Sequence, residues 1–253
     1  MKNSTDRFSD IEEVLIRHLR LYHYPVAIFF ERDGKEQISA EKRPKNRLSF
    51  CQLLAHVRQV GGSLRLYPKF LGCATAADLF GFSREEEKSL KTLNKYVSRD
   101  ASERFYADRP RFAPGTISSV ALCTLGRCDK EPDGVIMVVD SLQAMHLLDF
   151  YAKAVDKPDI PLGHSVNGAA CANTVKALKQ GAPQLAFPCP GAFTSGKMER
   201  GEVVLSFPWE AFQATVQVVF QRAEKGKFSL LGGPQLVGDD VCRNCPLIRF
   251  HES

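Results

Sequence analysis

Two segments of the chain share one pattern, and this pattern constrains the fold more than any other feature of the sequence. Each segment opens with a cysteine, runs through a helix-like stretch to a glycine ten positions on, passes through an apolar extended piece and reaches a second cysteine. The equivalent positions are Cys51 and Cys171, Gly61 and Gly181, and Cys73 and Cys189. Self-similarity of this length indicates duplication, and a pseudo-twofold fold would bring the four thiols together.

A second similarity follows each cysteine segment. Gly134–Ala154 and Gly201–Ala223 both read as a strand followed by a helix. Unrelated strand–helix units obey the same periods, so chance similarity is the alternative. With duplication, residues 1–160 form a first half with an insertion at about 74–133, and residues 161–253 form a second half, within one compact domain.

The expected fold class is α+β or mixed α/β, with two similar halves that share a sheet and have helices packed on it. The local patterns predict helices over residues 10–22 and 81–97 and strands over residues 26–30 and 116–125. The basic and aromatic stretch over residues 104–114 is expected to be a surface loop, or else a site for an anion or nucleotide.

Charge and hydropathy exclude several classes of protein. The 34 basic and 29 acidic side chains are mixed along the chain, whereas nucleic-acid binding favours a clustered basic face, so no nucleic acid is expected. No run approaches the roughly 18 apolar residues of a membrane span, and the polar N-terminus lacks the apolar core of a secretory signal. We therefore expect a cytoplasmic protein, whose eight cysteines serve as core residues, metal ligands or redox groups rather than disulfides.

The four cysteines of the repeated segments suit a metal centre. Cys51 and Cys171 stand where helices are predicted to begin, and helix N-termini lower the pKa of a thiol. Four thiolates can hold tetrahedral zinc or an iron–sulfur cluster. The pairs are 22 and 18 residues apart, whereas structural zinc ligands are usually two to four residues apart. The spacing favours a cluster of the [4Fe–4S] type at the seam between the halves; the alternatives are four small core residues, a zinc site and thiol redox chemistry.

A second set of cysteines consists of Cys123 and Cys128 with Cys242-x-x-Cys245-Pro near the C-terminus. Two thiols in a C-x-x-C can grip one ion by themselves. With Cys123 and Cys128 they would complete a zinc site that attaches the C-terminal segment to the rest of the domain. A redox dithiol and the absence of any site are the alternatives.

Among the histidines, only His164, in the glycine-rich approach to Cys171, is expected near a cofactor. The chain has no G-x-S-x-G elbow, Walker A loop, H-E-x-x-H or G-x-G-x-x-G, so the motifs of serine hydrolases, P-loop NTPases, zincins and dinucleotide-binding folds are missing.

The cysteine-centred stretches resemble the family called domain of unknown function 169, or uncharacterised ArCR. They are PVAIFF, the region of Cys51, Gly-Cys73, GAACANTVKALKQG, and FPCPGAF with the following GEVVLSFP, from about Tyr24 to Phe220. Two positions depart from the family pattern, Cys51-Gln52 in place of Cys-Pro and Pro190–Ala192 in place of a Gly-Asn-Arg-like run. The resemblance implies a shared thiolate-ligated centre at Cys51, Cys73, Cys171 and Cys189, and implies no particular activity.

We therefore expect a metal-binding protein that holds an iron–sulfur cluster through cysteines from both halves. It would act in electron transfer with a redox partner protein, or in a redox reaction that the sequence does not name. The alternatives are a non-enzymatic module that binds a tetrapyrrole-like cofactor in a cleft between the halves, and a zinc-stabilised accessory module.

Overall fold

The fold is built on a single six-stranded sheet. The computed structural model describes residues 4–39, 44–82, 98–157 and 168–224. Every pair of neighbouring strands is antiparallel, and the order across the sheet is β2-β3-β1-β4-β6-β5. The strands are β1 (Val26–Glu31), β2 (Ser63–Leu66), β3 (Ser119–Thr124), β4 (Gly134–Asp140), β5 (Gln184–Ala186) and β6 (Glu202–Pro208).

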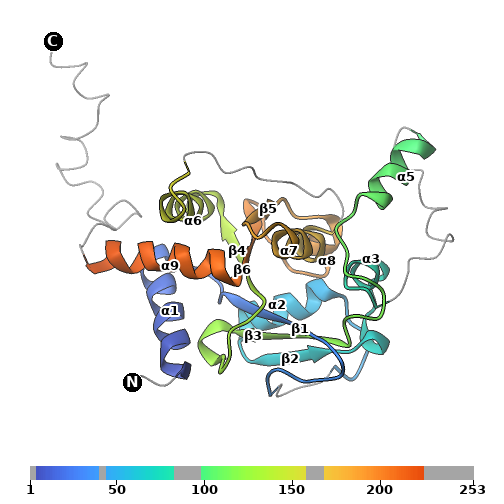
Figure 1. Ribbon diagram of the computed structural model, residues 1–253, viewed down its shortest axis with the longest axis horizontal. Helices are drawn as coiled ribbons and strands as arrows, with labels where there is room; N and C mark the ends of the chain where they lie inside the picture. The colour runs from blue at the N-terminus through green and yellow to red at the C-terminus, as the bar shows by residue number, and fades with distance from the viewer. Residues whose placement is uncertain (1–3, 40–43, 83–97, 158–167, 225–253) are drawn as a thin grey trace, which may run out of the picture.

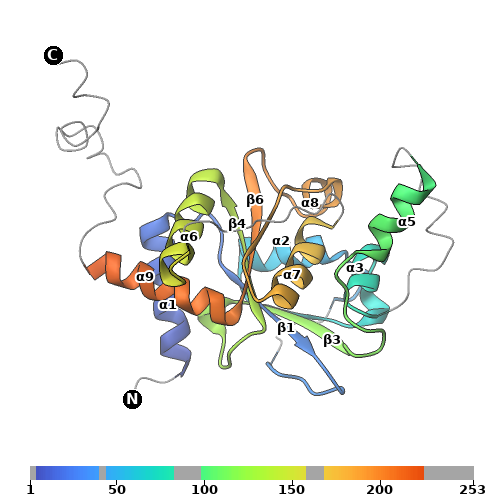
Figure 2. The same ribbon diagram turned by 45° about the horizontal axis from the view of Figure 1, so that its top comes forward.

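Helices cover both faces of this sheet (Figure 1). One face carries α1 (Ser4–Leu19), α6 (Ser141–Ala154) and α9 (Trp209–Glu224). The opposite face carries α2 (Phe50–Val60), α3 (Ala74–Leu79), α7 (Ala169–Gln180) and α8 (Pro190–Thr194). Figure 2 shows α5 (Arg99–Ala107) extending outward beyond α3, away from α1, α6 and α9. Short 3-10 turns, η1 (Pro68–Phe70) and η2 (Leu125–Arg127), follow β2 and β3.

The alternation of side chains along the strands creates two separate cores. In β1, Val26, Ile28 and Phe30 pack under α2, α3 and α7, while Ala27 and Phe29 pack under α1, α6 and α9. Successive side chains of a strand point to opposite faces, so a strand covered on both faces is apolar throughout, as VAIFF is. The sheet therefore separates the cysteines of its two faces into distinct environments.

The mixed α/β class is confirmed, and several local predictions hold. The two predicted strand–helix units are β4 with α6 and β6 with α9. The first helix spans Ser4–Leu19 rather than residues 10–22. The loop predicted over residues 104–114 was partly wrong, because α5 continues to Ala107. The helix predicted over residues 81–97 falls almost wholly outside the described residues.

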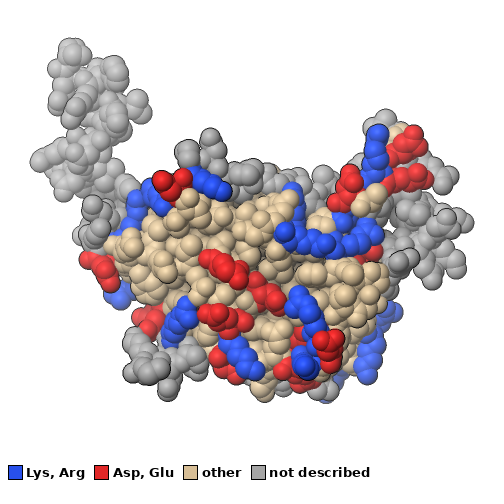
Figure 3. All heavy atoms as spheres, in the orientation of Figure 1, with Lys and Arg blue, Asp and Glu red and all other residues tan. Residues whose placement is uncertain are grey.

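The described residues also bear on the expectations about membrane spans and surface charge. None of the described helices is both long and apolar enough to cross a bilayer. On the face shown in Figure 3, basic and acidic side chains are interspersed.

Candidate functional site

The first cysteine segment is shaped by strong local signals. Ser49 caps α2 by accepting a hydrogen bond from the backbone N–H of Gln52, whose side chain in turn accepts from the backbone N–H of Ser49. This capping box places Cys51 in the first turn of α2. The helix ends at Gly61, whose φ of 82° favours glycine. After β2 and η1, Cys73 is the N-cap residue of α3.

The second cysteine segment has the same order of elements. Gly168, in the left-handed region with φ of 85°, precedes α7 and places Cys171 in its first turn. Gly181 ends α7 with φ of 65°, and β5 follows. Cys189 is the N-cap residue of α8, and Pro190 lies in the first helical turn. Proline suits this position because the first N–H groups of a helix have no partner within it. Helix, glycine, strand, cysteine and short helix therefore occur twice in this order.

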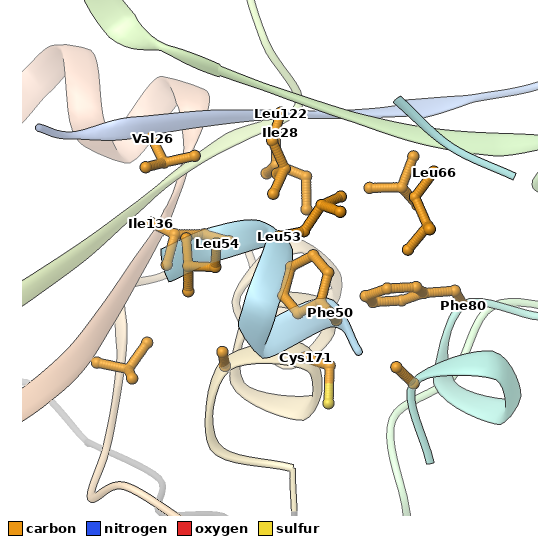
Figure 4. Close-up of a cluster of buried hydrophobic side chains, with 14 of the residues drawn as sticks. Val26, Ile28, Phe50, Leu53, Leu54, Leu66, Phe80, Leu122, Ile136 and Cys171 are labelled. Carbon is orange, nitrogen blue, oxygen red and sulfur yellow. The ribbon is translucent and has the colours of Figure 1, made fainter. Parts of the chain in front are cut away.

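The two segments meet on one face of the sheet. Cys171 is buried and Cys51, Cys73 and Cys189 are half-buried, and all four pack in or against the same apolar cluster. The thiol of Cys51 is hydrogen-bonded to that of Cys189 and lies within electrostatic range of those of Cys73 and Cys171. The predicted convergence of the four thiols is thus present. Figure 4 shows Cys171 beside Phe50 and Phe80, with its sulfur directed away from the strands.

The contact between Cys51 and Cys189 changes the pKa values of the two thiols in opposite directions. The hydrogen bond from Cys51 lowers the pKa of Cys189 to about 5, although burial acts in the opposite direction. Backbone N–H groups of Ala169, Ala192 and Gly168 also favour the Cys189 thiolate. The same hydrogen bond, together with burial, raises the pKa of Cys51. At neutral pH the pair is a thiolate at Cys189 held by a thiol at Cys51.

Cys171 is in a more apolar place. Burial raises its pKa, and the neighbouring sulfurs of Cys73 and Cys189 act in the same direction. The backbone N–H of Ala172 and the Arg109 guanidinium partly oppose this rise. Arg109, from the stretch expected to be a surface loop, is in fact buried, with Nη1 at 3.8 Å from Asp78 Oδ2 in α3. A positive charge therefore lies within electrostatic range of the most buried of these four thiols.

The site fits a sulfur-bound group through its donor set and through the absence of a side chain at Gly168. A Cβ at Gly168 would lie 3.1 Å from Cys171 Sγ and 3.3 Å from Ala172 Cβ, so even alanine would press on the sulfur. Among the described residues, no three His, Cys, Asp or Glu side chains are already arranged to hold a single metal ion. A tetrahedral Zn–S distance of about 2.3 Å brings four sulfurs to about 3.8 Å from one another, whereas thiolates bound to different iron atoms of a cluster lie farther apart.

A buried arginine links the two segments and was missed by the sequence patterns. Arg58 lies in α2 seven residues after Cys51, and its Nη2 donates to the carbonyl oxygens of Gly196 (3.0 Å) and Lys197 (2.7 Å), just after α8. Its Nη1 is 3.7 Å from Glu202 Oε1. Burial of arginine is rare without partners, and no local pattern in the sequence indicates partners so distant along the chain.

Hydrogen bonds from α7 also fix the second segment to the sheet. The buried Asn173 donates through Nδ2 to Gln184 O at 2.7 Å and to Val204 O at 3.3 Å. The Thr174 hydroxyl is 3.1 Å from that of Ser206. These bonds join α7 to β5 and β6 and so fix the start of α7, where Cys171 stands. The sequence indicates this attachment only through the small and polar residues Ala172, Asn173 and Thr174 near the start of the helix.

Of the remaining predicted site residues, the structure describes only Cys123 and Cys128, and it places them elsewhere. Cys123 and Cys128 pack in the other cluster, under α1, α6 and α9, so the sheet separates them from the four cysteines. His164, Cys242 and Cys245 lie outside the described residues, so their predicted roles stay predictions.

Comparisons with known proteins give a family and no function. The family model described as Uncharacterised ArCR, domain of unknown function 169, matches residues 14–218 of the 253. No curated protein and no solved structure matches significantly. The matched region contains α2, α3, α7 and α8 and therefore all four converging cysteines. The chain thus belongs to the uncharacterised ArCR family, domain of unknown function 169.

Proposed function

We propose that this protein binds an iron–sulfur cluster of the [4Fe–4S] type through Cys51, Cys73, Cys171 and Cys189. The observation that carries the proposal is the convergence of four thiols from two distant segments on one face of the sheet. A bound cluster supplies one-electron chemistry. The function would be electron transfer to a redox partner protein, or a redox reaction, in the cytoplasm.

Each part of the site has a defined role under this proposal. Cys189 is already held as a thiolate, the form that binds metal. Cys171 lies deepest, and Arg109 compensates part of the negative charge that thiolates would bring there. The glycine at 168 leaves space beside the Cys171 sulfur. N–H groups near the sulfurs are among the features that set the potential of such centres.

The proposal extends to the origin of the fold. Each cysteine pair stands in the same order of helix, glycine, strand and short helix. Duplication of an ancestral half would explain why one site draws two ligands from each segment. The expected consequence is that loss of either pair abolishes binding, because each segment supplies only two of the four ligands.

One observation favours a second function. A thiolate at Cys189 in hydrogen-bond contact with the Cys51 thiol is the arrangement of an attacking and a resolving cysteine in thiol–disulfide exchange. In that reaction the Cys189 thiolate would attack a disulfide substrate and displace one thiolate, and Cys51 would attack the mixed disulfide and displace the other, which leaves a Cys51–Cys189 disulfide. A thiol reductant such as glutathione would then reduce this disulfide and allow the next turnover. The protein would then be isolated without metal and would turn over disulfides.

Anaerobic purification followed by counting of iron, sulfide and zinc separates these functions. We expect broad visible absorption and about four iron and four sulfide per chain. Zinc alone would support a zinc-stabilised module, and a sharp Soret band would support a tetrapyrrole carrier. A colourless, metal-free protein would contradict the proposal, and its activity toward disulfides would then decide for thiol exchange.

The variants include a matched control. Alanine at Cys51, Cys73, Cys171 or Cys189 should each lower the iron content, whereas Cys128→Ala, a buried thiol on the opposite face, should leave it unchanged. Circular dichroism verifies that each variant is folded. Equal iron loss in Cys128→Ala would mean that the centre is not at the four converging cysteines.

A further inference from the structure

A second pair of thiols lies on the other face of the sheet and has no part in the proposed site. Cys123 stands in β3 and Cys128 closes η2. Their side chains are 1% and 0% exposed, and the two Sγ atoms are 2.9 Å apart. The usual optimum between non-bonded carbon atoms is about 3.5–4.0 Å, and a disulfide bond is about 2.05 Å. The two sulfurs are therefore in unusually close contact.

The local chain fixes the two sulfurs in this position. η2 turns the chain back so that Cys128 N–H donates to Leu125 O at 3.1 Å, and Leu125 N–H donates to Pro25 O at 3.0 Å. From the other side, Glu12 of α1 accepts a hydrogen bond from Gly126 N–H at 2.9 Å. The turn is thus held both by the residue that precedes β1 and by α1. Little of the contact depends on flexible side chains, since a cysteine has a single χ1 torsion.

We propose that Cys123 and Cys128 form a reversible intramolecular disulfide, a modification site independent of the four-cysteine centre. A disulfide such as oxidised glutathione is the oxidant. One protein thiolate attacks a glutathione sulfur and displaces one glutathione thiolate; the second protein thiolate then attacks the mixed disulfide and displaces the other. Two protein thiols lose two protons and two electrons, and one oxidised glutathione becomes two glutathione thiols.

The surroundings of the pair make this oxidation slow in the native state. The hydrogen bond from Cys123 and burial raise the pKa of Cys128, and the nearby Glu12 and Asp129 carboxyls act in the same direction. Exchange needs a thiolate and access for the oxidant. Because α1 packs against η2, we expect the oxidant to reach the pair when α1 separates from η2, and the rate of oxidation to follow that opening.

Tryptic digestion reads this disulfide directly, because Arg127 lies between the two cysteines. The reduced full-length protein is incubated with oxidised glutathione, blocked with N-ethylmaleimide and digested. Cleavage separates residues 112–127 from residues 128–130, so a disulfide holds the two peptides together without alkyl groups. We expect the linked pair to replace the two alkylated peptides, and to disappear with dithiothreitol. Low concentrations of urea, below the unfolding transition, should accelerate its formation several-fold.

The controls separate this disulfide from other outcomes. Cys242→Ser/Cys245→Ser should form the linked pair as wild type does, while Cys123→Ser and Cys128→Ser should lose it. Two alkylated peptides after prolonged oxidation of wild type would overturn the proposal without any variant. So would bound zinc that is lost in Cys123→Ser, because the sulfurs would then be metal ligands. The peptide readout does not depend on whether the four-cysteine centre binds iron.

Discussion

Replacement of Arg58 by methionine tests whether a buried cation holds the two cysteine segments together. The guanidinium is 1% exposed and donates to two carbonyl oxygens just after α8, with Glu202 at 3.7 Å. Removing one member of a buried ion pair costs about 3–5 kcal/mol. We expect about 3 kcal/mol, the lower end, because Glu202 retains His23 at 2.7 Å.

The free energy of unfolding from urea titration measures this loss. About 3 kcal/mol corresponds to a fall in Tm of about 6–12 °C for a chain of this size. Arg58→Lys should lose about 1–2 kcal/mol, because lysine keeps the charge but not the planar fork. The matched control is Arg7→Met, whose exposed pair with Glu131 at 3.2 Å should contribute at most about 1 kcal/mol.

A second readout tests the connection to the site rather than to stability alone. Arg58 follows Cys51 by seven residues in α2, and Gly196 follows Cys189 by seven, so the arginine contact and the thiol contact join the same two segments. Loosening it should raise the pKa of Cys189, measured as the pH dependence of its alkylation by iodoacetamide. If Arg58→Met loses no more stability than Arg7→Met, the reasoning on burial is wrong. If stability falls but the pKa of Cys189 does not move, the arginine does not position the thiols.

Three further predictions concern other charged contacts. Cys51→Ala should raise the pKa of Cys189 from about 5 by about 1–2 units, because it removes a hydrogen bond to a charged group worth about 1.5–3 kcal/mol; an unchanged alkylation profile would contradict this. Glu31→Gln should cost about 3–5 kcal/mol in urea titrations, because it breaks a fully buried bidentate pair with Arg65 at 2.7 and 2.8 Å; a loss below about 1 kcal/mol would refute it. Burial and the Arg58 charge lower the pKa of His23 in the folded protein below 6.5. The contribution of His23 to stability is therefore fully present above pH 6.5, the pKa in the unfolded chain, and is lost as the pH falls from there through the lower pKa of the folded protein. His23→Gln should flatten the plot of unfolding free energy against pH below pH 6.5. An unaltered slope would mean that other groups cause this pH dependence.

Local signals in the sequence were sufficient to predict that helices begin near Cys51 and Cys171, but not that Cys73 and Cys189 precede the short helices α3 and α8. Ser49 and Gln52 form a capping box that fixes the start of α2, and Gly61 and Gly181 end their helices with positive φ. These effects act within one or two turns, so spacing along the chain reveals them. The convergence of the two segments was predicted from the repeat, and the structure places the four thiols together.

The rest depends on contacts that no local pattern encodes. Arg58 and Arg109 are buried against Gly196 and Asp78. These partners lie 138 and 31 residues away along the chain, so no local pattern reveals them. An arginine in an amphipathic helix or a basic loop is normally read as surface. Cys123 lies on the opposite face from the four converging cysteines because side chains alternate along β3, and which set of side chains meets which helices is decided by packing across the whole domain.

Cys189 and Cys128, on opposite faces of the sheet, have opposite electrostatic environments, and this difference supports opposite chemistry at the two sulfurs. Around Cys189, a thiol and three backbone N–H groups stabilise the anion. Around Cys128, a thiol, burial and two carboxyls oppose it. Thiolate is the form that binds metal, and a metal that binds thiols displaces their protons; Cys189 therefore offers a first ligand, whereas Cys51 and Cys171, whose pKa values are raised, would lose their protons as the centre forms. A pair kept as thiols reacts only when the fold opens, so the second environment suits slow, reversible oxidation.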